Sequence, residues 1–537
     1  MSLQELFEHN APFYSYSLAQ PANRDKIRIL CLKPGDWDDP IECQLEWRYL
    51  SDDYWTLSYV WGDYKDHKSI RVNSQSDFWM TENAFTALRR LRWLDKKEKM
   101  DGIIIWIDAI CINQADIRER NAQVAMMGDI YKKAKSVIIW LGNCVPLLPG
   151  QSEDIECADK THETAVAMFM NSTLAWWQRC WTYQEFVLSE NAYFVKGSHV
   201  YPFWYYFTDK FPEQLQPLLL QTRLPEPVSL FSLLAQTRRR EATNPRDKVY
   251  SVLAACRSEG GNLVLEVDYA KSPGQIAYEA CAVMLEQGHS IAYLHQIFGF
   301  AYSDTVVSWV PGIVTPCHLP YVTHEWNVEY KGDLLHMLGQ VDHSWCSKHG
   351  PSGREEQKCR IQDKTLFVEG LLFEEVVQKV TRSQDGFADL DLESRLTTLA
   401  AIQDQQTQGQ SELIKANRSL FDKINRRVSL KPKTKSVTDW HEIVAMIDTG
   451  AMLFFTRTGS IGIASSVVEI GDLVTVLFGF PRVIILRPCT SDAVGDTGNA
   501  TISYRMVSEA LVPSIEGGQL VDLFKRGRVT KQEFKIV

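Results

Sequence analysis

The residues that follow an apolar run at 103–107 have side chains that could serve catalysis or ligand binding. The run predicts a buried strand, and it leads directly into Asp108, Cys111, Asn113 and Gln114. Polar groups gathered where a strand ends are where α/β proteins usually bind ligands. Asp108 could act as a general base or orient a ligand's amide or hydroxyl group, or it could simply cap the turn that leaves the strand.

The other three polar residues of this segment also have competing interpretations. Asn113 and Gln114 can each donate and accept hydrogen bonds, so they could bind the polar edge of a ligand or pin the loop in place. Cys111 would need a lowered pKa and a nearby base to act as a nucleophile. Because the segment contains no histidine, we interpret Cys111 as a small buried hydrophobic residue.

A second chemically capable segment spans residues 179–185 and ends in Glu185. Partial burial behind aromatic and amide side chains would raise the pKa of Glu185, which makes it the better candidate for a general acid or base. The rival interpretation is an ion pair with Arg120 or Arg179. Trp181 could stack on a planar ligand and Gln184 could bind its polar groups.

Alternating strand and helix patterns position these segments. Strands are predicted at 55–60, 103–107 and 136–141. Thr81 is expected to cap one intervening helix, and Asp116 with Glu119 forms a predicted capping box for the next. Such alternation predicts a parallel sheet flanked by helices, whose right-handed crossovers bring successive strand ends to one edge.

That edge would also carry Trp61 and Gly62, which follow the first of these strands. Trp61 could stack on a planar ligand or seal the core, and Gly62 permits a tight backbone turn. We therefore expect a crevice with Trp61, Gly62, Asn113, Gln114, Trp181 and Gln184 as ligand-binding residues, and Asp108 and Glu185 as catalytic residues.

Several classes of function are disfavoured. The net charge of −10 argues against a nucleic-acid binder. No G-x-G-x-x-G follows the first strand and no Walker lysine motif occurs, so no nucleotide cofactor is expected. The group at 343–349 (two His and one Cys) lacks the paired spacing of structural zinc sites, so no metal is expected. With no signal peptide and no membrane-spanning run in the sequence, we expect a cytoplasmic protein with reduced thiols.

Composition changes along the 537 residues predict several domains. We expect an N-terminal hairpin extension at 1–50, the α/β domain at 51–200 and a helical region packed on it at 201–330. A C-terminal region at 331–537 follows, with a Gln-rich linker near 403–410 and a smaller, mostly-β unit near 450–510.

The polar segments are also the sites of a family resemblance. The chain resembles the fungal heterokaryon-incompatibility (HET) domain family in several ordered blocks. These are residues 57–62 (LSYVWG), 106–114 (WIDAICINQ), 119–131 with Glu119-Arg120 and Gln123-Val124, 140–142 (WLG) and 179–185 (RCWTYQE). The last block departs from the family's usual Trp-Thr-Leu-Gln-Glu at Tyr183, which affects local packing more than chemistry. Weaker downstream likenesses, such as 244–250 (NPRDKVY), extend the resemblance over nearly the whole chain.

The resemblance implies a fungal protein of nonself recognition and regulated cell death. It implies an α/β domain distantly similar to Toll/interleukin-1-receptor (TIR) domains, some of which cleave NAD, so NAD is a candidate substrate. The partners would be other fungal incompatibility proteins or a small-molecule ligand. The alternative is a HET-like enzyme of secondary-metabolite biosynthesis that cyclises or rearranges a small apolar substrate, which the high aromatic content of 11% would suit.

Overall fold

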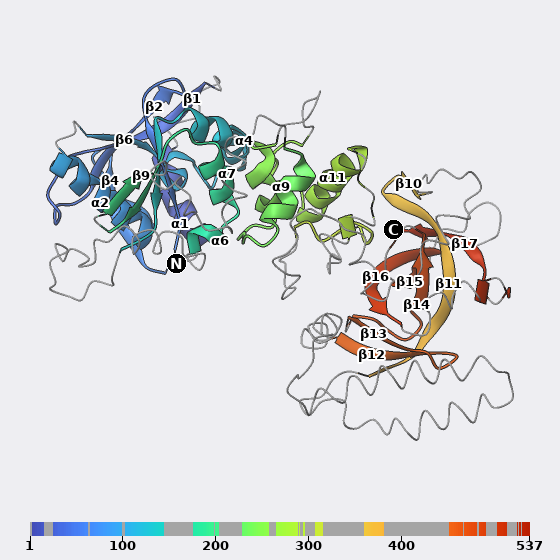
Figure 1. Ribbon diagram of the computed structural model, residues 1–537. Helices are drawn as coiled ribbons and strands as arrows, with labels where there is room; N and C mark the ends of the chain where they lie inside the picture. Colours follow the sequence, from blue (N-terminus) through green and yellow to red (C-terminus); the bar gives the residue numbers. More distant parts are fainter. Residues whose placement is uncertain are drawn as a thin grey trace. The chain divides into compact units, whose positions relative to one another are not determined.

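The chain divides into two compact units in a computed structural model (Figure 1), residues 1–284 and 285–537. The structure describes, with short gaps, residues 3–14, 25–143, 175–202, 228–295, 307–314, 359–380, 451–489 and 502–537. The predicted linker near 403–410 and the residues 343–349 lie outside the described residues. Each unit is described by itself.

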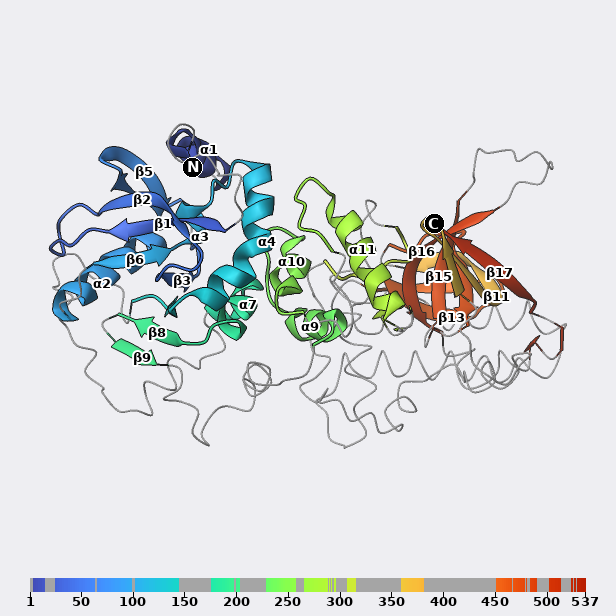
Figure 2. The ribbon, with the colours of Figure 1, turned by 90° about the horizontal axis from the view of Figure 1, so that it is seen from above.

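A nine-stranded sheet in the order β5-β4-β2-β1-β6-β3-β7-β8-β9 forms the centre of the N-terminal unit (Figure 2). Its strands are β1 (Lys26–Leu32), β2 (Glu42–Tyr49), β3 (Trp55–Tyr59), β4 (His67–Val72), β5 (Gln75–Thr81), β6 (Ile103–Trp106), β7 (Ser136–Trp140), β8 (Ala192–Lys196) and β9 (His199–Pro202). The three strands predicted at 55–60, 103–107 and 136–141 are confirmed as β3, β6 and β7. All five residues of β7 are buried, which explains its continuous apolar sequence.

The predicted parallel sheet is confirmed only in part, because the sheet is mixed. β6, β3, β7 and β8 are mutually parallel. β1 instead runs antiparallel to both β2 and β6, and hairpins add β5 to β4 and β9 to β8. Short turns can join antiparallel neighbours, so these strands enter the sheet without a crossover helix. The β1–β2 hairpin is thus continuous with the sheet.

Helices with the expected caps connect the parallel strands. Thr81 Oγ1 accepts from Ala84 N at the start of α2 (Glu82–Glu98). Asp116 caps α4 (Ile117–Lys133) by accepting from the backbone N–H groups of Arg118 and Glu119. The predicted capping box is wrong in its second half, because the Glu119 side chain turns to Arg28 of β1.

Short helices complete this unit. They are α1 (Leu3–Asn10), η1 (Ala11–Tyr14), α3 (Asp108–Cys111), α6 (Ala175–Gln178) and α7 (Trp181–Val187). The described parts of the predicted helical region contain α9 (Leu230–Thr237), α10 (Asp247–Leu253) and α11 (Pro273–Glu286). α7 contacts β3, α4 and α10, so the helix that carries Glu185 lies between the sheet and the helical region.

The C-terminal unit is mostly β, as expected. Its strands are β10 (Cys359–Gln362), β11 (Thr365–Val380), β12 (Ala451–Thr456), β13 (Ile461–Ser465), β14 (Leu473–Leu477), β15 (Val483–Cys489), β16 (Ser503–Leu511) and β17 (Lys531–Ile536). Pairing of β11 with both β12 and β14 closes β11-β12-β13-β16-β15-β14 into a ring. Apolar side chains such as Val376, Phe454 and Val476 fill its core.

Membrane-spanning helices and groups of metal-binding side chains are both absent from the residues that the structure describes. Among the described helices, none combines the length and apolar character needed to cross a membrane. Within the same residues, His, Cys, Asp and Glu side chains form no group of three or more that could hold a metal ion.

Candidate functional site

The Asp108 carboxylate lies at the exit of β6, where α3 begins. Its Oδ2 accepts from Trp61 Nε1 at 2.8 Å and its Oδ1 accepts from Ala109 N at 2.8 Å. The Asp108 side chain thereby joins the exit of β6 to the exit of β3. Burial raises the pKa of Asp108, although the positive charge of Arg179 and the Trp61 hydrogen bond oppose the rise. The residue is still partly exposed, so it remains the more accessible of the two predicted catalytic carboxylates.

Glu185 lies deeper, on α7, with 3% of its surface exposed. Ser58 Oγ, from the middle of β3, donates to Glu185 Oε2. Trp176 Nε1 donates in turn to Ser58 Oγ at 2.8 Å. Burial raises the pKa of Glu185 to about 7, against the lowering effects of Arg179 and Ser58. Near neutral pH the carboxyl is therefore close to half protonated, a state suited to general acid–base work.

Arg179 is the cation that both carboxyl groups share. Its positive charge favours the ionised form of both Asp108 and Glu185. It therefore offsets part of the rise in pKa that burial causes in each carboxyl group. Its Nη1 donates to the backbone carbonyl of Tyr59, and its guanidinium lies 5.9 Å from the centre of the Trp61 ring. Arg120 instead stacks on Tyr269, 4.1 Å from the ring centre. Of the two arginines proposed as partners of Glu185, Arg179 is the one that lowers its pKa.

The buried carboxyls also act on tyrosines beneath the strand ends. The pKa of Tyr59 is well above its usual value, first because of burial and then because of Asp108. The pKa of Tyr131 is raised by burial and by Glu185. Two acids with raised pKa values, one shared arginine and neutral tyrosines make an environment that can exchange a proton with a ligand. This arrangement is the candidate site.

The amides predicted to bind a ligand hold the loop together in this conformation. Asn113 Oδ1 accepts from Ala115 N at 3.2 Å, and Gln114 Nε2 donates to the Asp108 carbonyl at 3.0 Å. Cys111 is 1% exposed, and burial raises its pKa to about 12, which fits the interpretation as a buried hydrophobic residue.

A buried ion pair supports the same loop from below. Arg28 Nη2 donates to Glu119 Oε2 at 2.6 Å, and Arg28 Nη1 also donates to the Cys111 carbonyl at 3.0 Å. Glu119 Oε1 accepts from Asn113 N at 2.7 Å. The rings of Tyr14 and Trp47 each lie 4.7 Å from the Arg28 guanidinium. The 106–114 segment is therefore fixed at Cys111 and Asn113 by charge-assisted hydrogen bonds.

Of the two remaining residues of α7 that were expected to bind a ligand, Trp181 contacts the helical region and Gln184 is buried. The Trp181 side chain hydrogen-bonds to Asp247, whose pKa is raised by burial. Gln184 is 1% exposed, and its Oε1 accepts no hydrogen bond from the described residues. Arg240 packs on the start of α7 and donates to the Arg179 carbonyl at 3.2 Å.

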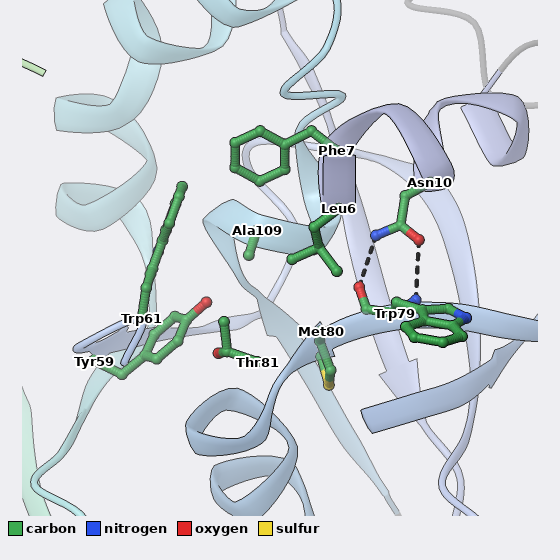
Figure 3. A pocket seen from close by; sticks show the side chains of 9 residues that line it. All are labelled: Leu6, Phe7, Asn10, Tyr59, Trp61, Trp79, Met80, Thr81 and Ala109. Atoms are coloured by element: carbon green, nitrogen blue, oxygen red, sulfur yellow. Dashed lines mark hydrogen bonds between the residues drawn. The ribbon is translucent and has the colours of Figure 1, made fainter. Parts of the chain in front are cut away.

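A narrow cavity of about 10 Å³ lies beside the strand exits, with room for about one water molecule. Tyr59, Trp61 and Ala109 contribute its floor, and β5 and α1 contribute the rest (Figure 3). Gly62 adopts a φ of +78°, which turns the chain immediately after Trp61. The structure thus brings Trp61 to the cavity, places Gly62 and Asp108 next in sequence to the lining residues Trp61 and Ala109, and keeps Gln184 and Glu185 buried.

Sequence reasoning missed Ser58, Tyr59 and the α1 residues of this site. The signal that could have identified Ser58 is a small hydroxyl residue between Leu57 and Tyr59 in a predicted buried strand, and the structure shows it fully buried. No short motif marks α1, whose role follows only from where it packs.

Comparison with known proteins agrees with the earlier resemblance. Residues 54–185 match the family model described as "Heterokaryon incompatibility protein (HET)". The chain is 36% identical over 141 residues to "Heterokaryon incompatibility protein 6, OR allele" of Neurospora crassa. The alignment covers 24% of this chain and 20% of that protein, so the chain spans only a fifth of its relative's length. No solved structure matches. Residues 54–185 are therefore a HET domain, whose boundaries take in every residue from β3 to Glu185.

Proposed function

We propose that this chain, whose residues 54–185 form a HET domain, acts in fungal nonself recognition and triggers a regulated cell-death response through the crevice at its strand exits. The observation that carries the proposal is that the charge of Arg179 acts on both Asp108 and Glu185, which come from two separate blocks of the matched domain, 106–114 and 179–185. Two carboxyl groups with raised pKa values beside one arginine are an arrangement typical of acid–base sites, which supports the proposal.

The proposed chemistry is acid–base catalysis on a small ligand held against Trp61. NAD is the substrate to test first, in keeping with the distant likeness expected to TIR domains. Hydrolysis would break the bond between nicotinamide and ribose: the water oxygen bonds to the ribose carbon, nicotinamide leaves as the neutral base, and a carboxylate of the site accepts the proton that the water releases. In this role Asp108 would contact the ligand, and Glu185 would store or release a proton behind it.

Expression of the full chain in a filamentous fungal host tests the proposal. We expect the unchanged chain to arrest growth and the Glu185→Gln variant to lose that effect, because glutamine keeps the shape but not the titration. The matched control is Glu190→Gln, at an exposed position shortly after α7. NAD content is measured in the same cells. If the Glu185→Gln variant arrests growth as strongly as the unchanged chain, the site has been wrongly assigned.

A further inference from the structure

The first helix of the chain lies directly over the candidate site. Leu6 and Phe7 of α1 point toward Ala109 and Trp61, and both line the narrow cavity (Figure 3). The Phe7 ring meets the Trp61 ring edge-on, with centroids 5.6 Å apart and an interplanar angle of 84°. Leu6 is 4% exposed. Phe7 therefore occupies the space in which a planar ligand ring would contact Trp61.

Asn10 attaches the end of this helix to the edge of the sheet. Its Nδ2 donates to the Trp79 carbonyl at 2.7 Å, and its Oδ1 accepts from Trp79 N at 2.9 Å (Figure 3). β5 is the outermost strand on that side of the sheet. The Asn10 side chain thus satisfies both backbone groups of one edge residue, as a neighbouring strand would.

The attachment of α1 is limited in extent. The helix has eight residues, and helices of this length are barely stable in water without tertiary contacts. Gln4, Glu5, Glu8 and His9 are exposed, although the His9 ring still meets the Trp79 ring edge-on with centroids 5.2 Å apart. Beyond the helix, Tyr14 is anchored separately, because its hydroxyl donates to the Ile110 carbonyl at 2.8 Å and its ring packs on Arg28. The helix can therefore detach while the chain stays tethered at Tyr14.

We propose that α1 is a displaceable intramolecular cover, in which Phe7 stands in for the ring of a ligand and keeps the strand-exit crevice closed. The effect of this cover on activity rests on the proposed function. Whether α1 closes the crevice can be measured without that function. Ligands of the class that fits would present a planar ring to Trp61 and a hydroxyl or amide donor to Asp108. Such a ligand must displace α1 before it can bind.

Cysteine labelling measures the cover without reference to any activity. Ala109→Cys places a thiol on the cavity floor, and N-ethylmaleimide modification at that position is followed by mass spectrometry. Phe7→Ala with Asn10→Ala removes one ring contact and two hydrogen bonds, so the labelling rate should rise by about tenfold or more. Gln4→Ala removes only the exposed hydrogen bond from Gln4 Nε2 to Glu8 Oε1 within α1, so as the matched control it should change the rate by less than about twofold.

Internal reporters keep the result interpretable. Cys180 is 1% exposed in the same domain, so its labelling in any variant would reveal unfolding. Hydrogen exchange at the Trp79 amide, which loses its Asn10 partner, should accelerate alongside. If the double variant changes the labelling rate at position 109 by less than about twofold while Cys180 stays protected, the proposal that α1 covers the crevice is wrong. Growth arrest is scored separately: if no variant affects the host, the proposed function fails and the labelling result still decides on the cover.

Discussion

Ser58, in the centre of β3, donates a hydrogen bond to the buried carboxylate of Glu185, which lies 127 residues further along the chain. Trp176 donates to the same Ser58 oxygen. One small hydroxyl thus connects the central sheet, α6 and α7. Because the side chain of Ser58 is fully buried, neither partner can exchange this hydrogen bond for one to solvent.

Ser58→Ala should therefore destabilise the N-terminal unit. The change leaves an indole N–H and a carboxyl group without their partner, at a cost of about 1–3 kcal/mol in the free energy of unfolding. Urea unfolding followed by tryptophan fluorescence measures the loss. Ser69→Ala, at an exposed position of β4, is the control and should shift stability by less than about 0.5 kcal/mol. Equal stabilities for the two variants would mean that the Ser58 hydrogen bonds contribute nothing.

The raised pKa of Glu185 predicts a pH dependence of stability with a definite sign. Between the ordinary carboxyl pKa of 4.5 and the folded value of about 7, the native state holds a proton that the unfolded chain has released. Stability from this group is therefore fully present below pH 4.5 and falls as the pH rises through 7, by roughly 3 kcal/mol.

Glu185→Gln isolates this contribution. The stability difference between the Gln variant and the unchanged protein should widen in favour of Gln as the pH is raised from 5 to about 8. Chemical denaturation at several pH values, with Glu190→Gln as the exposed control, provides the measurement. A difference that stays constant with pH would show that Glu185 titrates at its ordinary pKa.

The buried pair Arg28–Glu119 should be indispensable to the 106–114 loop. Arg28→Met leaves the Glu119 carboxylate buried without its partner, which costs about 3–5 kcal/mol. Adding Glu119→Gln removes the unpaired buried charge but retains an acceptor for Asn113 N. The double variant should therefore regain part of the free energy of unfolding that Arg28→Met loses.

An exposed ion pair serves as the control for the Arg28 and Glu119 variants. Lys33 and Glu42 are 3.4 Å apart, with 42% and 41% of their side chains exposed. Lys33→Met should change stability by less than about 1 kcal/mol. Thermal unfolding of the single and double variants gives the coupling energy. A double variant no more stable than Arg28→Met would contradict the assignment of Glu119 as a charge held by Arg28.

Much of the parallel core of the sheet could be predicted from the sequence. The apolar runs ending at Trp61, Asp108 and Gly142 identified β3, β6 and β7, and Thr81 and Asp116 identified two helix starts. The antiparallel additions were harder. Nothing local to the β1 sequence says that it pairs with β6, and the β4–β5 hairpin turns at Asn73 and Ser74, two non-glycine residues with positive φ. Strand pairing depends on the fold as a whole, not on local periodicity.

The sequence singles out Asp108 and Glu185 by type and position, and their catalytic roles stay predictions. How far each is buried could not be predicted from the sequence: Asp108 is partly exposed and Glu185 is not. The contacts of Asn113 and Gln114 lie within their own loop. Arg28, Ser58 and Phe7 act across long sequence separations, so no motif of a few residues could have revealed them.

The most direct test of the central claim is the viable count of a fungal host after induction of the full chain. The comparison includes the unchanged protein, Asp108→Asn, Glu185→Gln and the exposed control Asp129→Asn on α4. We predict that the unchanged protein and Asp129→Asn reduce viability by at least about tenfold relative to Asp108→Asn and Glu185→Gln at equal expression. Equal killing by all four proteins, or by none of them, would contradict a cell-death function that depends on these two carboxyl groups.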